Sequence, residues 1–316
     1  MKLVGESPVF LAVTRTLARM ARFEIPILIE GETGTGKELA ARVVHYQSER
    51  ANRPFIPVNC GALPETLVEN ELFGHERGAF TDARESRPGV ITLAEGGTLF
   101  LDEIEALSAK AQVSLLRFLQ DHRNRPLGAA TDRRANVRII AATNQNLERL
   151  VERGEFRSDL FFRIKILFLN LPPLRLRAGD ATLLADYFLD ECTRRFQQPR
   201  KRLSPQTRIW LESYQWPGNV RELENLIVRE SLMADGTELV CAPQVSPAVT
   251  AAAPQAGSYA AAKAAVVADF ERRFVRDLLT RSSGNVTRAA AEAGKDRRAF
   301  GPLLKKHGLR TSEFRP

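Results

Sequence analysis

The stretch Ile25-Pro-Ile-Leu-Ile-Glu-Gly31-Glu-Thr-Gly-Thr-Gly-Lys37-Glu38 decides the fold. A short apolar run is followed directly by a glycine-rich loop, and a helical pattern then runs over residues 36–47. This order of strand, loop and helix is typical of a P-loop, where backbone N–H groups close around phosphate oxygens. We therefore expect a nucleotide site formed by Gly31, Glu32, Thr33, Gly34, Thr35, Gly36, Lys37 and Glu38. Lys37 would reach the terminal phosphates, whereas Glu38 stands where such loops usually carry a magnesium-binding Ser or Thr.

A second signal is the apolar run Gly96-Gly-Thr-Leu-Phe-Leu-Asp102-Glu103, which ends in two acids. At the carboxyl end of a strand, Asp102 is expected to hold Mg²⁺ beside the P-loop and Glu103 to polarise an attacking water. Asn144, in Ala141-Ala-Thr-Asn144, is expected to orient that water. The alternatives are that the acids cap the next helix and that Asn144 forms an ordinary turn.

Apolar β-rich runs and helical patterns alternate along the first part of the chain. The expected strands are residues 25–29, 55–58, 98–101, 137–141 and 166–169, and helices are expected at 36–47 and 109–119. This alternation predicts an α/β fold with a parallel sheet covered by helices on both faces. Beyond Pro172-Pro173 we expect the strands to stop. A small helical lid would then follow at residues 182–196, 204–213 and 220–233.

Composition excludes several other classes of protein. The chain has 316 residues, of which 44% are hydrophobic and 27% charged, as in ordinary globular domains. Charge interrupts every apolar run before it reaches the length of a membrane span, and no secretory signal is recognised. The three cysteines, Cys60, Cys192 and Cys241, are odd in number, far apart and without metal-binding spacing, which suggests a reducing cytosol. We therefore expect a cytoplasmic protein, and the interrupted apolar runs predict no membrane partner.

Positive charge is concentrated at the carboxyl end of the chain. The net charge is +8, and residues 263–316 contain thirteen basic and six acidic side chains, a net of +7. Residues 239–262 carry no charge and include three prolines, which predicts a linker. A small basic module beside a near-neutral body suits contact with the DNA backbone, the alternative being a solvated basic tail.

Helical patterns at residues 264–280, 285–294 and 295–307, with glycine turns, predict a helix-turn-helix in the basic module. Arg297 and Arg298 are candidates for base or phosphate contacts, and Lys305 and Lys306 for backbone phosphates. Gly301-Pro302 interrupts the last helical pattern, because proline removes a backbone donor. The alternative is a three-helix interaction module whose arginines are solvated.

Six motifs together resemble the AAA+ domain of bacterial sigma-54-dependent activators over about residues 3–235. They are residues 31–38, 71–83, 96–104, 156–160, 171–175 and 216–223. In this family a glutamate usually follows the P-loop lysine, as Glu38 does here. The basic module resembles the Fis-type helix-turn-helix that ends many of these activators. The resemblance implies an AAA+ P-loop NTPase with a helical lid, followed by a small all-α DNA-binding domain.

The resemblance also implies a homo-oligomeric ring, a hexamer, with ATP and Mg²⁺ bound between subunits. Arg157 and Arg163 match the arginine fingers that reach the neighbour's γ-phosphate, where a guanidinium suits the charge on phosphoryl oxygens. Arg221 matches the sensor arginine of the lid. Asn59 matches the asparagine that holds the catalytic glutamate inactive until the ring engages its target, the alternative being a strand-end Asn that bonds its own backbone.

The segment Gly78-Ala-Phe-Thr-Asp-Ala83 matches the family loop Gly-Ala-Phe-Thr-Gly-Ala, which grips sigma-54. Phe80 and Thr81 are the expected contact residues. Asp82 replaces the second glycine and adds a Cβ and a negative charge at the contact. An alternative function is therefore an ATP-binding and DNA-binding regulator that does not remodel sigma-54. A general AAA+ chaperone or helicase-like motor is a second alternative.

We expect four parts: an AAA+ α/β ATPase core (1–171), its helical lid (172–238), a linker (239–262) and a Fis-type DNA-binding domain (263–316). The resemblance implies a transcriptional activator that binds upstream, enhancer-like DNA sites and hydrolyses ATP to remodel the sigma-54 RNA polymerase holoenzyme for promoter opening. No sensory domain precedes the ATPase in this sequence, so we expect either a fragment or control by a separate regulatory protein or by expression.

Overall fold

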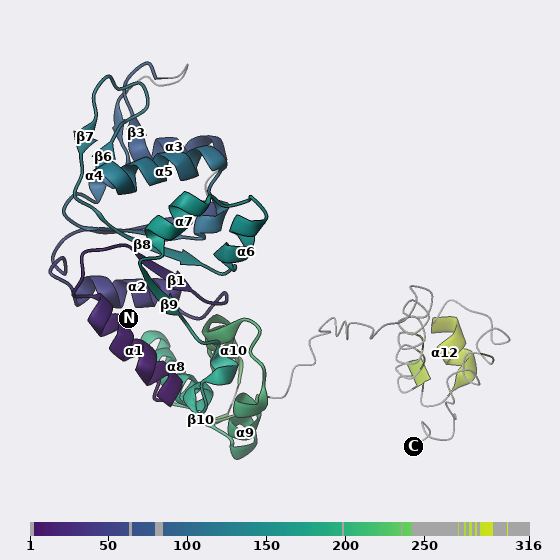
Figure 1. The fold of residues 1–316 in the computed structure, drawn as a ribbon. Helices are drawn as coiled ribbons and strands as arrows, with labels where there is room; N and C mark the ends of the chain where they lie inside the picture. The colour runs from purple at the N-terminus through teal and green to yellow at the C-terminus, as the bar shows by residue number, and fades with distance from the viewer. Residues whose placement is uncertain are drawn as a thin grey trace. The chain divides into compact units, whose positions relative to one another are not determined.

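The computed structural model describes residues 3–62, 65–79, 85–197, 199–234 and 236–241, and in the carboxyl-terminal part residues 271, 275, 278–279, 282, 285–292 and 302. The chain divides into two compact units, Met1–Gln244 and Val245–Pro316. Figure 1 shows the labelled helices and strands. The contact-loop residues Phe80, Thr81 and Asp82, most of the linker, and the candidate DNA-contact residues Arg297, Arg298, Lys305 and Lys306 lie outside the described residues.

A five-stranded parallel sheet forms the centre of the first unit, in the order β2-β5-β8-β1-β9. Figure 1 labels three of these strands, β1, β8 and β9. The strands are β1 (Ile27–Glu30), β2 (Phe55–Asn59), β5 (Thr98–Asp102), β8 (Arg138–Thr143) and β9 (Leu167–Asn170). All five predicted strands are confirmed, with ends that differ by one or two residues. Because neighbouring strands are parallel, Asn59 is paired with Asp102 at the carboxyl edge, and Glu30 with Thr143.

Alternate side chains of the strands pack on opposite faces of the sheet. Leu99 and Leu101 of β5 belong to one hydrophobic cluster, whereas Phe100 belongs to the other. The second cluster is covered by α1 (Pro8–Met20) and α2 (Lys37–Tyr46), and the first by α3 (Glu65–Phe73), α5 (Ala109–Asp121) and α7 (Ser158–Ile164). The predicted parallel sheet with helices on both faces is therefore confirmed.

Short elements complete the core. They are η1 (Cys60–Ala62), α4 (Val90–Leu93), η2 (Ile104–Ala106), α6 (Leu147–Glu152) and two hairpins, β3 (Gly74–His75) with β4 (Arg87–Pro88) and β6 (Arg123–Asn124) with β7 (Arg133–Arg134). Leu127 joins the two hairpins, because its N–H donates to Gly74 O at 2.8 Å and its O accepts from Glu76 N at 2.9 Å. Gly128 lies so close to Ala79 that a Cβ there would approach the Ala79 Cβ to 2.9 Å.

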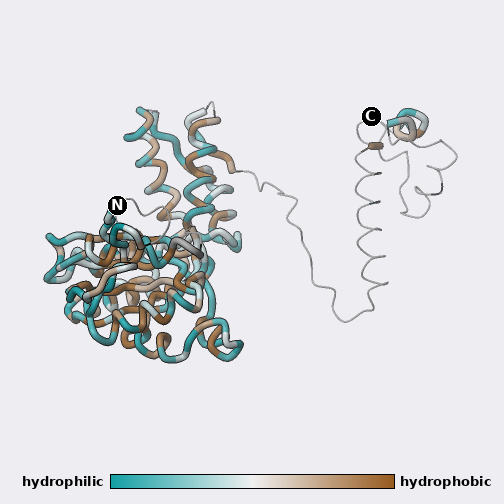
Figure 2. The backbone as a smooth tube through the Cα atoms, turned by 90° about the horizontal axis from the view of Figure 1, so that it is seen from above, coloured by the Kyte–Doolittle hydropathy of each residue, from teal (hydrophilic) through white to brown (hydrophobic). Residues whose placement is uncertain are grey.

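The lid contains η3 (Leu174–Leu176), α8 (Asp180–Phe196), α9 (Pro205–Ser213) and α10 (Asn219–Met233). Hydrophobic and hydrophilic residues alternate along these helices (Figure 2), and the hydrophobic ones form a cluster around Trp216. The prediction that strands stop before the lid is wrong. Two-residue strands β10 (Arg202–Leu203) and β11 (Glu238–Leu239) pair in parallel, and they are too short to leave a periodic pattern.

The lid extends beyond the position at which we expected the linker to begin. Leu239 and Cys241 are 1% and 5% exposed and pack in the lid cluster. The Cys241 N–H donates to Thr207 Oγ1 at 3.0 Å, which fixes the end of the segment on α9.

A buried ion pair attaches the amino-terminal segment of the core to the lid. Arg177 Nε donates to Asp180 Oδ2 at 2.8 Å, and both side chains are at most 2% exposed. Asp180 also accepts from the Glu6 and Ser7 N–H groups at 2.7 and 3.0 Å and from Ser7 Oγ at 2.9 Å. The guanidinium stacks over Phe10 at 3.8 Å from the ring centre. Each charge is therefore compensated where water cannot reach it.

The second unit is described in part. Helix α12 (Val286–Glu292) begins after Asn285, whose Oδ1 accepts from the Thr287 and Arg288 N–H groups at 3.1 and 3.2 Å. Its Ala289 and Ala290 pack with Val275, Leu278 and Leu279. This part agrees with the first two predicted helical segments, and Pro302 is helical and exposed. Among the described helices, none combines the length and hydrophobicity needed to cross a membrane.

Replacing Asp180 by Ala should destabilise the first unit strongly. The change leaves the Arg177 guanidinium buried without its partner and removes three further hydrogen bonds, so we expect a loss of about 3–5 kcal/mol. Denaturant-induced unfolding measures this free energy. Asp190 on the same helix pairs with Arg200 at the surface, and Asp190→Ala should cost less than about 1 kcal/mol. Equal losses for the two variants would contradict the role assigned to the buried pair.

Candidate active site

The P-loop joins β1 to α2 at the carboxyl edge of the sheet. Gly34 and Gly36 have φ angles of +81° and +98°, a region in which other residues are strained. Gly36 caps α2, so the helix begins at Lys37 and its free N–H groups face the loop. Thr35 stabilises the turn, because its N–H and hydroxyl both donate to Glu32 O, at 3.3 and 2.8 Å.

A cavity of about 270 Å³ opens over this loop, and we call it the P-loop cavity. Ten of the predicted site residues line it: Thr33, Gly34, Gly36, Lys37, Glu38, Asn59, Asp102, Glu103, Asn144 and Arg221. They come from five separate segments of the chain. The parallel sheet brings four of these segments together at its carboxyl edge, and the lid helix α10 supplies Arg221. Gly31, Glu32 and Thr35 belong to the loop but do not line this cavity.

Lys37 is 8% exposed and is folded back onto its own loop. Its ammonium donates to Gly31 O at 2.9 Å and to Glu32 O at 3.4 Å. Burial lowers the pKa of Lys37, and the nearby carboxylates of Asp102, Glu105 and Glu103 oppose that shift. The cavity thus has a cation beside several carboxylates.

The two acids at the end of β5 differ in backbone conformation. Glu103 has a left-handed φ of 54°, which is unusual for a residue other than glycine, and its N–H donates to Asp102 Oδ1 at 3.1 Å. The bend turns the Glu103 carboxylate toward Gly61, where a Cβ would lie 2.3 Å from Glu103 Oε2. A strained residue held in place at a cavity is typical of functional sites.

The two amides lie on either side of these acids. Asn59 Oδ1 accepts from the Gly61 and Ala62 N–H groups at 2.8 and 3.1 Å, which is the local bonding that we considered as the alternative. Asn144 Nδ2 donates to Thr33 Oγ1 at 3.1 Å, so this amide is fixed against the P-loop. Both side chains are exposed to the cavity.

Glu38 is engaged in an ion pair. Its Oε1 accepts from Arg42 Nη2 at 2.7 Å and from Arg42 Nε at 2.9 Å, one turn along α2. Arg42 also lies over the Phe55 ring, 4.7 Å from its centre. The sequence analysis did not single out Arg42, because an i, i+4 pair on a helix has the same pattern as an ordinary surface pair.

The lid closes the cavity directly over the P-loop. Val220 N donates to Gly34 O at 3.0 Å, and a Cβ on Gly34 would lie 2.3 Å from Gly218 O. Arg221 follows in α10 and lines the cavity. The Glu32 carboxylate turns away from the cavity and pairs with Arg175 of the lid, a role that the sequence did not indicate.

Arg157 and Arg163 do not line the P-loop cavity of their own chain. Arg157 is exposed before α7 and pairs with Asp159 at 2.7 Å. Arg163, also exposed, donates to Leu119 O at 3.2 and 3.3 Å. Arg157 and Arg163 therefore both lie at the surface, one just before α7 and the other within it.

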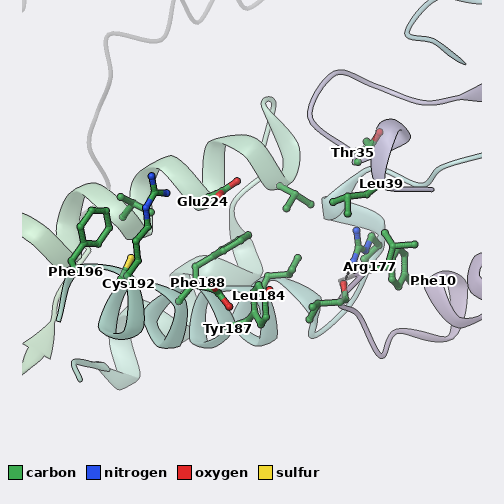
Figure 3. Close-up of a pocket in the computed structure, with 17 residues that line it drawn as sticks. Phe10, Thr35, Leu39, Arg177, Leu184, Tyr187, Phe188, Cys192, Phe196 and Glu224 are labelled. Atoms are coloured by element: carbon green, nitrogen blue, oxygen red, sulfur yellow. Dashed lines mark hydrogen bonds between the residues drawn. The ribbon is translucent and has the colours of Figure 1, made fainter. Parts of the chain in front are cut away.

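A second, more apolar pocket of about 360 Å³ continues from the P-loop between the amino-terminal segment and the lid (Figure 3). Thr35 and Leu39 lie at one side of it, and Leu184, Tyr187 and Phe188 of α8 at another. The sequence analysis missed this pocket, because the spacing of its α8 residues is that of any amphipathic helix. Which segments pack against this face of α8 depends on contacts between residues that are far apart in the sequence.

Sequence comparisons identify the family. The Sigma-54 interaction domain matches residues 3–170, and the AAA+ ATPase lid domain matches residues 175–261. The chain is 42% identical over 315 residues to the transcriptional regulatory protein GlrR of Escherichia coli, covering 99% of this chain and 69% of GlrR. It is 48% identical over 235 residues to the Nif-specific regulatory protein of Azotobacter vinelandii, covering 74% of this chain and 45% of that protein.

Among solved structures, NtrX of Brucella abortus in complex with ATP aligns with a TM-score of 0.75 at 32% identity. The alignment covers 98% of this chain and 70% of the NtrX chain. The similarity thus extends over the sheet, the P-loop and the lid that surround the cavity. The chain belongs to the sigma-54-dependent transcriptional activators, which carry an AAA+ ATPase domain with a helical lid.

Proposed function

We propose that this chain hydrolyses ATP to remodel the sigma-54 RNA polymerase holoenzyme and so permits promoter opening. The observation that carries the proposal is the P-loop cavity, where Lys37, the acids Asp102 and Glu103, and the lid residue Arg221 converge. These are the groups that phosphoryl transfer requires, namely positive charge at the phosphates, a carboxylate that holds the metal ion and a carboxylate that activates the attacking water. Membership in the sigma-54-dependent activators supports the choice of target.

In the proposed mechanism the P-loop N–H groups and Lys37 bind the β- and γ-phosphates, and Arg221 binds them from the lid. Asp102 would hold Mg²⁺ with the phosphates, since carboxylate oxygen is a ligand type that Mg²⁺ takes. The metal supplies neutralisation of charge on the phosphate oxygens. Among the described residues there is no cluster of three metal-ligating side chains, and Mg²⁺ commonly relies on phosphates and waters for its other ligands.

Glu103 would accept a proton from the attacking water, and Asn144 would orient that water. The proximity of Asn59 and Glu103 around Gly61 supports a role for Asn59 in restraining the carboxylate until the target is engaged. The apolar pocket that continues from Thr35 and Leu39 would accept the nucleobase, because a flat aromatic base suits an apolar site beside the phosphates.

The neighbouring subunit would complete the site with Arg157 and Arg163. Both are exposed on or just before α7 and away from their own cavity, as residues that act in another subunit must be. This supports a homo-oligomeric ring, which we propose to be a hexamer. A guanidinium from the neighbour would stabilise the charge that develops on the γ-phosphate oxygens.

The hairpin of β3 and β4 carries the segment 78–83, in which Phe80 and Thr81 are the proposed contacts with sigma-54. The second hairpin braces it through Leu127 and through the close contact of Gly128 with Ala79. Asp82 favours the alternative function, an ATP-binding and DNA-binding regulator that does not remodel sigma-54, because its charge would lie at the contact.

We further propose that residues 263–316, after the linker, form a Fis-type domain that binds upstream DNA sites. The excess of basic residues and the packing of α12 against Val275, Leu278 and Leu279 support a small helical module. Arg297 and Arg298 would contact bases or phosphates, and Lys305 and Lys306 the phosphate backbone. Such a regulator acts in the cytoplasm.

Substitutions at Lys37 and Glu103 should separate binding from hydrolysis. Lys37→Ala removes the buried cation and should abolish ATP binding, measured by titration with a fluorescent ATP analogue. Glu103→Gln keeps the size of the side chain but removes the base, so binding should persist while turnover falls about 100-fold or more.

The matched control is Glu152→Gln, which makes the same change at an exposed position at the end of α6. It should leave both binding and phosphate release unchanged. Promoter opening by sigma-54 holoenzyme, followed with a permanganate footprint, should require the wild-type or control chain and fail with Glu103→Gln. A Glu103→Gln chain that hydrolyses ATP at the wild-type rate would refute the role of the carboxylate.

Charge reversal at Arg297 and Arg298 should weaken DNA binding. The plot of log affinity against log salt concentration has a negative slope. Each lost phosphate contact should make that slope shallower by about 0.9, because fewer counterions are released. Fluorescence anisotropy at several salt concentrations measures both effects. The control is Arg15→Glu with Arg22→Glu, two exposed arginines of the ATPase unit. Identical isotherms for the Arg297/Arg298 variant and the wild type would exclude this surface.

A further inference from the structure

The Glu32 carboxylate joins the P-loop to the lid. Arg175 Nη1 and Nη2 donate to Glu32 Oε2 and Oε1 at 2.8 and 2.6 Å, a bidentate arrangement, and Asn219 Nδ2 donates to Oε2 at 3.1 Å. The hydrogen bonds from Arg175 lower the pKa of Glu32 to about 2, so the carboxylate is charged at neutral pH. The carboxylate of Glu32 thus binds the lid.

Asn219 is buried and uses both polar atoms of its side chain at this junction. Its Nδ2 also donates to Thr33 O at 3.1 Å, and its Oδ1 accepts from Leu174 N at 2.8 Å. Its φ of 52° is left-handed, a conformation that Asn tolerates better than most residues. The first residue of α10 is therefore held at a single place on the P-loop.

The two residues that follow Asn219 connect this junction to the P-loop cavity. Val220 N donates to Gly34 O at 3.0 Å, and Arg221 lines the cavity. The link thus involves three consecutive P-loop residues on one side and the first turn of α10 on the other. Because the N–H groups of the same loop would face the phosphates, a shift of the loop must also move the start of α10.

We propose that Glu32 is a positioning residue: through Arg175 and Asn219 it fixes the start of α10 on the P-loop, and so sets where Arg221 enters the P-loop cavity. The inference rests on the ATP site of the proposed function and assigns a route by which nucleotide at the P-loop moves the lid. The acid acts through Arg221 and does not itself touch the phosphates.

Hydrogen exchange tests the link without relying on activity. Glu32→Gln removes the charge that holds Arg175, so the amides of residues 219–222 should exchange about two- to fivefold faster, as expected for the loss of a partly exposed pair. The matched control is Asp186→Asn, which breaks another bidentate pair, with Arg208 at 2.9 and 3.0 Å, inside the lid. In Asp186→Asn, the amides of residues 219–222 should exchange at the wild-type rate. Unchanged exchange in Glu32→Gln would overturn the proposal.

Kinetics test whether the link acts through Arg221. Glu32→Gln should raise the KM for ATP about two- to fivefold in the wild-type background and should have no further effect in an Arg221→Ala background. Fully additive effects of the two changes would overturn the proposal, because they would mean that Glu32 acts independently of Arg221. Failure of the ATP site itself would appear separately, as unimpaired ATP binding in Lys37→Ala.

Discussion

The close approach of Gly34 to the lid is the constraint on which the rest of the structure depends. No side chain fits between this glycine and Gly218, and the Gly34 carbonyl accepts from the Val220 N–H. The same short loop therefore has two faces, with N–H groups available to phosphate on one and carbonyl groups that hold α10 on the other. The position of the lid and the shape of the P-loop cavity are coupled because one backbone segment contributes to both.

Much of the fold could be predicted because its signals are local. The P-loop, the acids that end β5 and the alternation of strands and helices each depend on residues near one another in sequence. Parallel strands then bring Asn59 beside Asp102 by topology alone. These features placed eight predicted site residues around one cavity, and the family resemblance added Asn59 and Arg221.

The features that the sequence did not indicate depend on contacts between distant segments. The partners of Glu32 lie more than 140 residues away along the chain, and a Glu in a P-loop is equally compatible with a role at phosphate. The buried pair of Arg177 and Asp180 looks like a surface pair until the amino-terminal segment covers it. Strands β10 and β11 are only two residues long, so no periodicity could reveal them.

In the proposed function, ATP at this site drives action on sigma-54 even with Asp82 in the contact loop. The most direct measurement is capture of purified sigma-54 by the full chain with ADP and a γ-phosphate transition-state mimic, compared with ADP alone. We expect capture only with the mimic, because the proposed mechanism couples an occupied γ-phosphate position to engagement of sigma-54. No capture under either condition, from a chain that still hydrolyses ATP and binds DNA, would contradict the account and favour a regulator that acts without sigma-54.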